Sequence, residues 1–225
     1  MKVSAGTVFS FAKENPPISG CTISETVTGG DTPAVCYSLA EGTDISAEIY
    51  FSHKLLIVSA GELTVFTPEG DIASLHALDG IVTPVDVPVG TRTDTSAVYL
   101  EIPARRNQNM NNAVKIGEVF RLGELVPYQD GKIVNMDVTS SKTMKFALMA
   151  FDAGTGLSEH AAPGDALIFA LDGEGVIGYE GEGVIGYEGE EHVIRAGENF
   201  RFARGGKHFV RADKRFKMAL FLTLE

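Results

Sequence analysis

Short apolar runs separated by glycine-containing turns recur along this chain. ALIFAL (166–171) and VIGY (176–179) are rich in β-branched or aromatic residues, and Asp-Gly and Glu-Gly turns bound them. HVIRA, NFRFA, HFVRA and MALFLTL follow at similar spacing, and NFRF alternates apolar with polar positions. No stretch of helical length shows an amphipathic pattern. The pattern therefore predicts an all-β protein whose many short strands form a sandwich or a barrel.

The pattern occurs twice. Residues 6–28 align with 117–139 at an offset of 111, and residues 41–63 align with 153–175 at an offset of 112. Near the end, VYLEI (98–102) aligns with MALFL (218–222) at an offset of 120. A polar, Asn-rich segment separates the two halves. We therefore expect two β domains, at 1–103 and 117–225, joined by a linker at 104–116.

A shorter, perfect repeat lies inside the second half. GEGVIGYE stands at 173–180 and again at 181–188, and the rise in offset from 112 to 120 equals its length. We interpret the second copy as an insertion without a binding role. It either lengthens a hairpin by about four residues in each strand or loops out of it. Because Val, Ile and Tyr favour strand pairing, the lengthened hairpin is preferred.

The composition of the chain limits the kinds of partner that it is expected to bind. The formal charge is −11 and neither sign forms a long block, so we expect no binding to nucleic acid or to anionic membranes. No apolar run reaches the roughly 18 residues of a membrane span. Cys21 and Cys36 lack a CxxC spacing and a neighbouring histidine, which suggests two buried thiols in a reducing cytoplasm. A small molecule is the expected partner, and a homodimer is also expected.

Two segments of the second half resemble the paired short motifs of the cupins. They are GLSEHAAPGDALIFALDGEG (156–175) and IRAGENFRFARGGKHFVRA (194–212). His160 stands at the first histidine of the first motif, and His208 stands at the last histidine of the second. Through the internal repeat the resemblance extends to much of the first half. It implies two tandem cupin jelly-roll barrels, a bicupin, of which the first barrel is degenerate.

The resemblance also implies a metal site. A complete cupin site holds a divalent metal on three histidines and one glutamate, but here Ala162 replaces the second histidine and Asp165 replaces the glutamate. The ligand set that remains is His160, Asp165 and His208, for Zn²⁺, Fe²⁺, Mn²⁺ or Ni²⁺ in the C-terminal domain. The alternative is that each imidazole is a hydrogen-bonded core residue. His160 and Asp165 are five positions apart, so the AAPG turn must reset the strand for both to meet one ion.

The first half departs further from the motif. The internal alignment places three residues at the positions of His160, Ala162 and Asp165, namely Glu48, Tyr50 and His53. The place of His208 falls within VPVGTRT, which contains no histidine. We expect no cofactor in the N-terminal domain. A packed barrel that supports the second domain is preferred over a polar pocket lined by these three residues.

We therefore expect a small-molecule-binding protein that holds its ligand in the C-terminal barrel, through a divalent metal or without one. Phe169 and Phe202 are the expected pocket residues, and no catalytic residue is named. One alternative is a metal-dependent enzyme of the isomerase, dioxygenase or decarboxylase type acting on a small polar substrate. Another is a scaffold or sensor without catalysis. Acidic and basic side chains that converge on one pocket would favour the enzyme. An apolar pocket would favour the binding protein, and two barrels filled by side chains would favour the scaffold.

Overall fold

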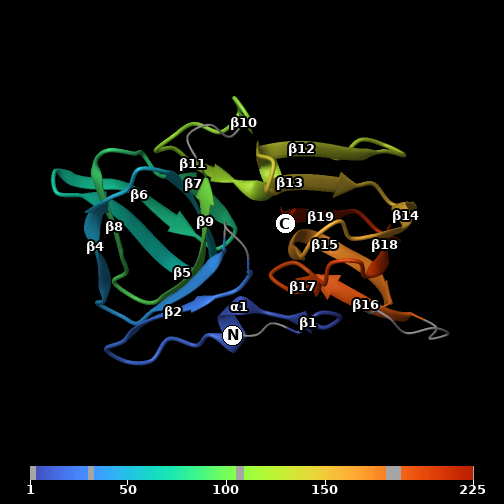
Figure 1. The fold of residues 1–225 in the computed structure, drawn as a ribbon, viewed down its shortest axis with the longest axis horizontal. Coiled ribbons are helices and arrows are strands. Elements are labelled where there is room, and N and C mark those ends of the chain that lie inside the picture. Colours follow the sequence, from blue (N-terminus) through green and yellow to red (C-terminus); the bar gives the residue numbers. More distant parts are fainter. Residues whose placement is uncertain (1–3, 30–32, 105–108, 181–188, 225) are drawn as a thin grey trace. The chain divides into compact units, whose positions relative to one another are not determined.

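The structure is a computed structural model that describes residues 4–29, 33–104, 109–180 and 189–224 (Figure 1). It divides into two compact units: an N-terminal unit, Phe11–Arg121, and a C-terminal unit, Lys2–Ser10 with Leu122–Glu225. Both units are built from strands, as the hydrophobic pattern predicted. Among the residues described, no helix combines the length and the apolar composition needed to cross a bilayer.

The N-terminal unit is a curled sheet that closes through one long strand. β5 (His53–Thr67) pairs with β7 and β9 over its first part and with β6 and β8 over its second part. The sheet order is β11-β7-β5-β9-β3-β2, with β4 beyond β8. Its other elements are α1 (Phe11–Glu14), β2 (Thr22–Thr26), β3 (Val35–Leu39), β4 (Asp44–Ile49), β6 (Gly70–His76), β7 (Asp79–Val82), β8 (Pro88–Arg92), β9 (Ala97–Ala104), β10 (Asn109–Met110) and β11 (Val119–Arg121).

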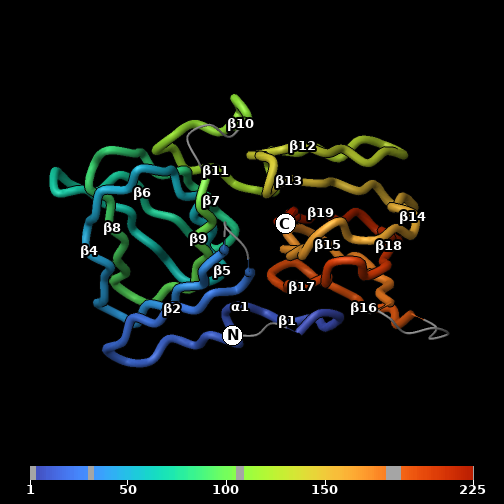
Figure 2. The backbone as a smooth tube through the Cα atoms, in the orientation of Figure 1, coloured from blue at the N-terminus to red at the C-terminus, as the bar shows by residue number. Residues whose placement is uncertain are grey.

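The strands of the C-terminal unit, from β1 to β12, repeat this order. Figure 2 traces the chain through both units. β15 (Ala166–Glu180) pairs with β17 and β19 and then with β16 and β18. The sheet order is β1-β17-β15-β19-β13-β12-β10, with β14 beyond β18, and β10 at its end has no counterpart among the described strands of the first sheet. Its other elements are β1 (Val8–Phe9), the 3₁₀ turn η1 (Leu122–Glu124), β12 (Ile133–Ser140), β13 (Met144–Phe151), β14 (Thr155–Ala161), β16 (Glu190–Arg195), β17 (Asn199–Phe202), β18 (Lys207–Ala212) and β19 (Phe216–Thr223). These are two tandem jelly-roll barrels.

Strand alternation decides which side chains fill each barrel. In β18, His208, Val210 and Ala212 are buried, whereas the residues between them are more exposed, because successive side chains point to opposite faces. The C-terminal core contains five aromatic residues among its aliphatic ones, namely Phe151, Phe200, Phe202, Phe216 and Tyr179. The N-terminal core is mainly aliphatic and includes Leu56, Val58, Leu63, Val65 and Tyr99.

Each unit contains a short strand from the other half of the chain. β1 pairs with β17, with Val8 opposite Phe200, and β11 pairs with β7, with Val119 opposite Ile81. These two strands occupy equivalent positions in the internal repeat. The compact units are therefore not two uninterrupted stretches of sequence, and the boundaries expected at 103 and 117 stay a prediction about the sequence halves.

The strand register corrects one part of the sequence alignment. Tyr99 lies opposite Val58 in the first barrel, and Met218 lies opposite Ala170 in the second. Met218 therefore corresponds to Tyr99, at an offset of 119, and the alignment that placed it on Val98 is wrong by one residue. Such a slip exchanges the two faces of a strand, and both Tyr99 and Met218 belong to their barrel cores.

The first copy of the octamer lies in the hairpin of β15 and β16. Its residues pair from Glu174, opposite Arg195, to Tyr179, opposite Glu190, and β15 is as long as β5, 15 residues each. The matching hairpin of β5 and β6 contains a register shift at Phe66 that this hairpin lacks. Apart from the octamer, this hairpin has one residue fewer than the hairpin of β5 and β6. For this reason the offset rises from 112 to 119, and not by the full eight residues of the octamer. Residues 181–188 lie outside the described residues, so the choice between a lengthened hairpin and a loop stays a prediction.

The two cysteines differ in environment. Both are free, Cys36 being buried and Cys21 exposed, so the expectation of two buried thiols is wrong for Cys21. Burial raises the pKa of the Cys36 thiol to about 12, which keeps it protonated and unreactive.

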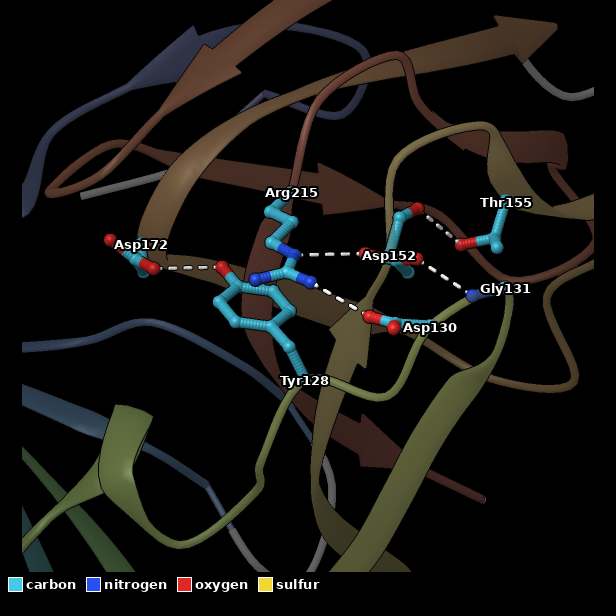
Figure 3. Close-up of polar contacts among 7 residues, drawn as sticks. All are labelled: Tyr128, Asp130, Gly131, Asp152, Thr155, Asp172 and Arg215. Carbon is cyan, nitrogen blue, oxygen red and sulfur yellow. Dashed lines mark hydrogen bonds and ion pairs between the residues drawn. The ribbon is translucent and has the colours of Figure 1, made fainter.

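Arg215 fastens the loop before β12 to the barrel (Figure 3). Its Nε donates to Asp152 Oδ1 at 2.8 Å, and its Nη2 lies 3.0 Å from Asp130 Oδ1. The second oxygen of Asp152 accepts a hydrogen bond from the Gly131 backbone amide at 2.7 Å. One carboxylate therefore joins two segments that are distant in sequence.

Tyr128 extends this contact to β15. Its hydroxyl donates to Asp172 Oδ2 at 2.7 Å, and Lys217 Nζ lies 4.5 Å from the centroid of its ring (Figure 3 shows the tyrosine and the aspartate). Lys217 Nζ also donates to the Gly123 carbonyl at 2.6 Å. Burial and the Asp172 carboxylate both raise the pKa of Tyr128, so the hydroxyl keeps the proton that it donates.

We expect deletion of residues 181–188 to leave the fold intact. The deletion joins Glu180 to Gly189 and closes the Tyr179 and Glu190 pair with a two-residue turn, as short hairpins allow. The thermal midpoint, measured by circular dichroism, should change by less than about 4 °C, because loop-closure entropy depends weakly on length. Loss of a cooperative transition would contradict the insertion interpretation.

We expect Asp152→Asn to lower the thermal midpoint in a pH-dependent way. The Gly131 amide and then Arg215 lower the pKa of Asp152 below its ordinary 3.8. Its stabilising effect is thus present above that value and is lost as the pH falls through the lower folded-state pKa. The difference between wild type and variant should be a few degrees at about pH 6 and should shrink as the pH falls through the lowered folded-state pKa of Asp152. A difference that stays constant with pH would refute this role.

Candidate functional site

Two histidines face each other at the mouth of the C-terminal barrel. β14 and β18 pair antiparallel, and His160 lies directly opposite His208. A register shift after Leu157 sets this pairing, as β-bulges do when they redirect side chains. The centroids of the two imidazole rings are 4.2 Å apart. The structure therefore brings together the two histidines that the sequence predicted would meet.

The hydrogen bonds define which ring nitrogen stays available. His160 Nδ1 lies 2.9 Å from the Ser158 carbonyl oxygen, and His208 Nδ1 lies 3.1 Å from the Gly206 carbonyl oxygen. A carbonyl oxygen only accepts, so each Nδ1 carries the proton and donates. In the neutral imidazoles, both Nε2 atoms are then left as acceptors, and neither has a hydrogen-bond partner among the residues described.

His208 is the more buried of the pair. It is 8% exposed, whereas His160 is exposed. Burial lowers the pKa of His208 below its ordinary 6.5, the hydrogen bond to Gly206 opposes this shift, and the nearby His160 adds to it. His208 is therefore a neutral acceptor at pH 7.

An aromatic cluster lies beneath the histidines. The Phe202 ring stacks on His208 with centroids 3.8 Å apart, and Tyr179 packs on Phe202 at 5.6 Å. The Tyr179 hydroxyl accepts a hydrogen bond from the Ala203 amide. Gly206 allows this arrangement, because a Cβ at that position would lie 2.7 Å from Tyr179 atoms. The glycine directly before Lys207 thus has a structural reason.

The two predicted pocket phenylalanines lie on different faces. Phe202 belongs to the barrel core and touches His208. Phe169 lies between Ile168 and Ala170 in β15, both of which belong to that core, and it packs against Phe146 at 6.3 Å. Because neighbouring strand residues point to opposite faces, Phe169 lies on the outer face of the sheet and does not border the histidines.

Asp165 does not join the histidines. Its Oδ2 lies 3.1 Å from Arg201 Nη2, and its Oδ1 accepts a hydrogen bond from the Arg204 amide at 3.2 Å. Within the described part of the chain, no three His, Cys, Asp or Glu side chains are placed to hold a metal. The expected three-ligand set therefore does not assemble, because the AAPG turn directs the carboxylate to Arg201. Two imidazoles alone do not fit the metal centre that the resemblance implied.

A pocket of about 110 Å³ borders His208. His208, Tyr179 and Lys207 contribute to it together with three carboxylates, Glu159, Glu180 and Glu191. Lys207 therefore faces acidic neighbours. The surroundings of this pocket are negatively charged, which disfavours an anionic ligand there.

The N-terminal barrel keeps the same backbone geometry without the histidines. A register shift after Ile45 matches the one after Leu157, and Glu48 lies opposite Val89. Tyr50 donates to Glu48 at 3.2 Å, and His53 Nδ1 lies 2.7 Å from the Thr83 carbonyl oxygen.

Sequence reasoning missed two charged residues inside this barrel. Lys54 Nζ lies 2.8 Å from Glu101 Oε1, and each side chain is 15% exposed. Both residues are in phase with the buried positions of their strands, Lys54 with Leu56 and Glu101 with Tyr99. In each strand, a charged residue stands at a position where the alternation predicts an inward-facing apolar one. That pattern is the signal in the sequence that would have identified Lys54 and Glu101.

Comparisons with known proteins support the fold. No family model and no curated protein matches this chain. Among solved structures, the "Cupin 2 conserved barrel domain protein" of Leptotrichia buccalis is 22% identical over 99% of this chain and 98% of its own, with a TM-score of 0.84. The Lactobacillus farciminis oxalate decarboxylase formate complex is 13% identical over 100% and 88%, with a TM-score of 0.55.

A third similar structure is described with a metal. Bacillus subtilis oxalate decarboxylase, in a study of its Mn(II) centres, is 13% identical over 99% of this chain and 78% of its own, with a TM-score of 0.54. At these identities the likeness concerns the fold alone. The chain thus has the double-barrel cupin fold that its two motifs suggested.

We expect the imidazole of His208 to titrate below pH 6.5. The unfolded chain then binds more protons than the folded one, so the free energy of unfolding falls as the pH drops below about 6.5. Nuclear magnetic resonance of the ring protons measures the titration, and His208→Gln assigns the signal and should reduce the pH dependence of stability. A midpoint above 6.5 would contradict the burial argument.

Proposed function

We propose that the C-terminal barrel binds a small uncharged molecule at its mouth through His160 and His208, without a metal. The observation that carries this proposal is the pair of unpartnered Nε2 acceptors whose rings lie 4.2 Å apart. Two acceptors held in fixed positions by backbone carbonyls match a ligand with two neighbouring hydrogen-bond donors.

Direct binding is favoured over binding through a metal. The described residues offer two imidazoles, and the carboxylate of Asp165 is engaged by Arg201. A divalent ion held there would take most of its ligands from water, whereas protein metal sites of this class use three or four side chains.

The charges around the site favour an uncharged ligand. His208 is neutral at pH 7 because burial lowers its pKa, so the buried member of the pair offers no positive charge to an anion. Glu159, Glu180 and Glu191 lie along the neighbouring pocket, and Glu191 is paired with Arg211. Among the residues that the structure describes, Lys207 is the single basic one that lines this pocket.

The packing of the barrel supports a ligand position above the aromatic cluster. Phe200, Phe202 and Phe216 fill the interior and are fully buried, so the free acceptors lie at the mouth. Stacking of Phe202 on His208 fixes the ring and lowers the entropy lost on binding. A cytoplasmic location and a homodimer remain predictions of the sequence.

We expect protein purified without chelating resin to contain less than about 0.1 metal ion per chain. Elemental analysis by mass spectrometry measures this directly. Stoichiometric metal that disappears in both His160→Ala and His208→Ala would overturn the proposal and restore the metal centre.

The same preparation tests binding itself. A panel of uncharged diols, phenols and amides is titrated while the histidine ring signals are followed by nuclear magnetic resonance. A compound that binds should shift both histidines and lose about tenfold or more in affinity in His208→Gln. If no compound shifts either ring, the scaffold alternative is favoured. If a compound is converted into a product, the enzyme alternative is favoured.

A further inference from the structure

The N-terminal barrel holds an ion pair where its C-terminal counterpart is apolar. Lys54 and Glu101 form a 2.8 Å ion pair on the inner face of β5 and β9. The matching positions in the second barrel are Ala166 and Leu220. Charges leave water only at a cost in free energy, so a pair retained inside one barrel and absent from the other points to a function.

Tyrosines form the walls around this pair. The Tyr37 and Tyr99 rings stack at 5.1 Å with an interplanar angle of 11°. The Tyr50 ring covers the pair from the other side, with Lys54 Nζ 3.3 Å from its centroid. The Tyr99 hydroxyl lies 3.0 Å from Thr91 Oγ1. Aromatic faces combined with a few fixed polar groups are typical of small-molecule sites.

The hydroxyls at this site stay protonated. Burial, followed by the charge of Glu101, raises the pKa of Tyr37 to about 12, and burial with Glu48 does the same for Tyr50. The Tyr37 hydroxyl has no hydrogen-bond partner among the residues described. It therefore offers a donor to a ligand beside Lys54 and Glu101.

Space at the site is limited by one side chain. The cavity between these residues has a volume of about 20 Å³, enough for a single water molecule. Tyr50 follows β4, and its hydroxyl is held by the exposed carboxylate of Glu48 at 3.2 Å. A compound larger than water therefore requires the Tyr50 side chain to turn away from Lys54, on which its ring now lies at 3.3 Å.

We infer that the N-terminal barrel binds a small uncharged polyhydroxy compound, such as a monosaccharide or polyol, between Lys54, Glu101 and the tyrosines. The ion pair is neutral overall, so an anion would face Glu101 and a cation would face Lys54. A hydroxyl group accepts from the ammonium while its neighbour donates to the carboxylate, and the ion pair remains intact. The C–H faces of such a compound pack on the tyrosine rings.

Three compounds with one carbon skeleton test the charge argument. D-Glucose, D-gluconate and D-glucosamine are titrated into the full chain by calorimetry and by saturation-transfer magnetic resonance, with D-ribose and meso-erythritol as smaller neutral probes. We expect at least one neutral probe to bind and to exceed its charged analogue in affinity about tenfold. Tighter binding of gluconate or glucosamine, or no binding by any probe, would overturn the inference.

Variants locate the site. Tyr37→Phe removes only a hydroxyl and should weaken binding about threefold to tenfold. The double variant Lys54→Met with Glu101→Met removes both charges together, which avoids leaving one buried charge unpaired, and it should abolish binding while melting cooperatively. As a control, Lys145→Met breaks a surface ion pair with Asp137 of the same 2.8 Å length, and this variant should bind the probe as wild type does.

The two proposed sites can also be told apart. His208→Gln should bind the probe normally in the N-terminal barrel, so the two proposals can fail independently. Equal binding by the double variant would overturn the inference.

Discussion

The register between β14 and β18 is the constraint on which the histidine pair depends. A bulge after Leu157 brings His160 opposite His208, and the backbone carbonyl two residues before each histidine then fixes its Nδ1 proton. The same bulge occurs after Ile45, where the pair is Glu48 and Val89. The geometry therefore belongs to the fold, whereas the chemistry belongs to the side chains placed on it.

The two barrels share one strand order but differ in the side chains that fill them. In the C-terminal barrel, phenylalanines fill the space beneath the histidines, so polar chemistry is confined to the mouth. In the N-terminal barrel, Lys54, Glu101 and two tyrosines, Tyr37 and Tyr99, carry polar groups inward. Since the strand order is shared, the difference lies in a few positions of the inward-facing set. The N-terminal half, whose sequence departs further from the metal-binding motif, is the half whose barrel interior carries the ion pair.

The exchange of β1 and β11 explains why the repeat and the compact units do not coincide. Each short strand extends a sheet of the other half, beside β17 or β7. The residues that follow, Phe11 and Leu122, are fully buried in the units that contain them. An added strand also covers a sheet edge whose backbone groups would otherwise lack partners. Neither half of the sequence supplies all the strands of one barrel.

By itself, the sequence determined the all-β class and the duplication, because alternation and turn residues act over a few neighbouring positions. The double-barrel fold and the two histidines were implied by the resemblance of its two motifs to those of the cupins. The position of Met218 was missed by one residue, because a bulge shifts register without a local signal. Only the tertiary structure decided that Asp165 meets Arg201, that Phe169 points outward, and that Lys54 meets Glu101. Those contacts join strands that are far apart in sequence, and their geometry is set by how the sheet closes.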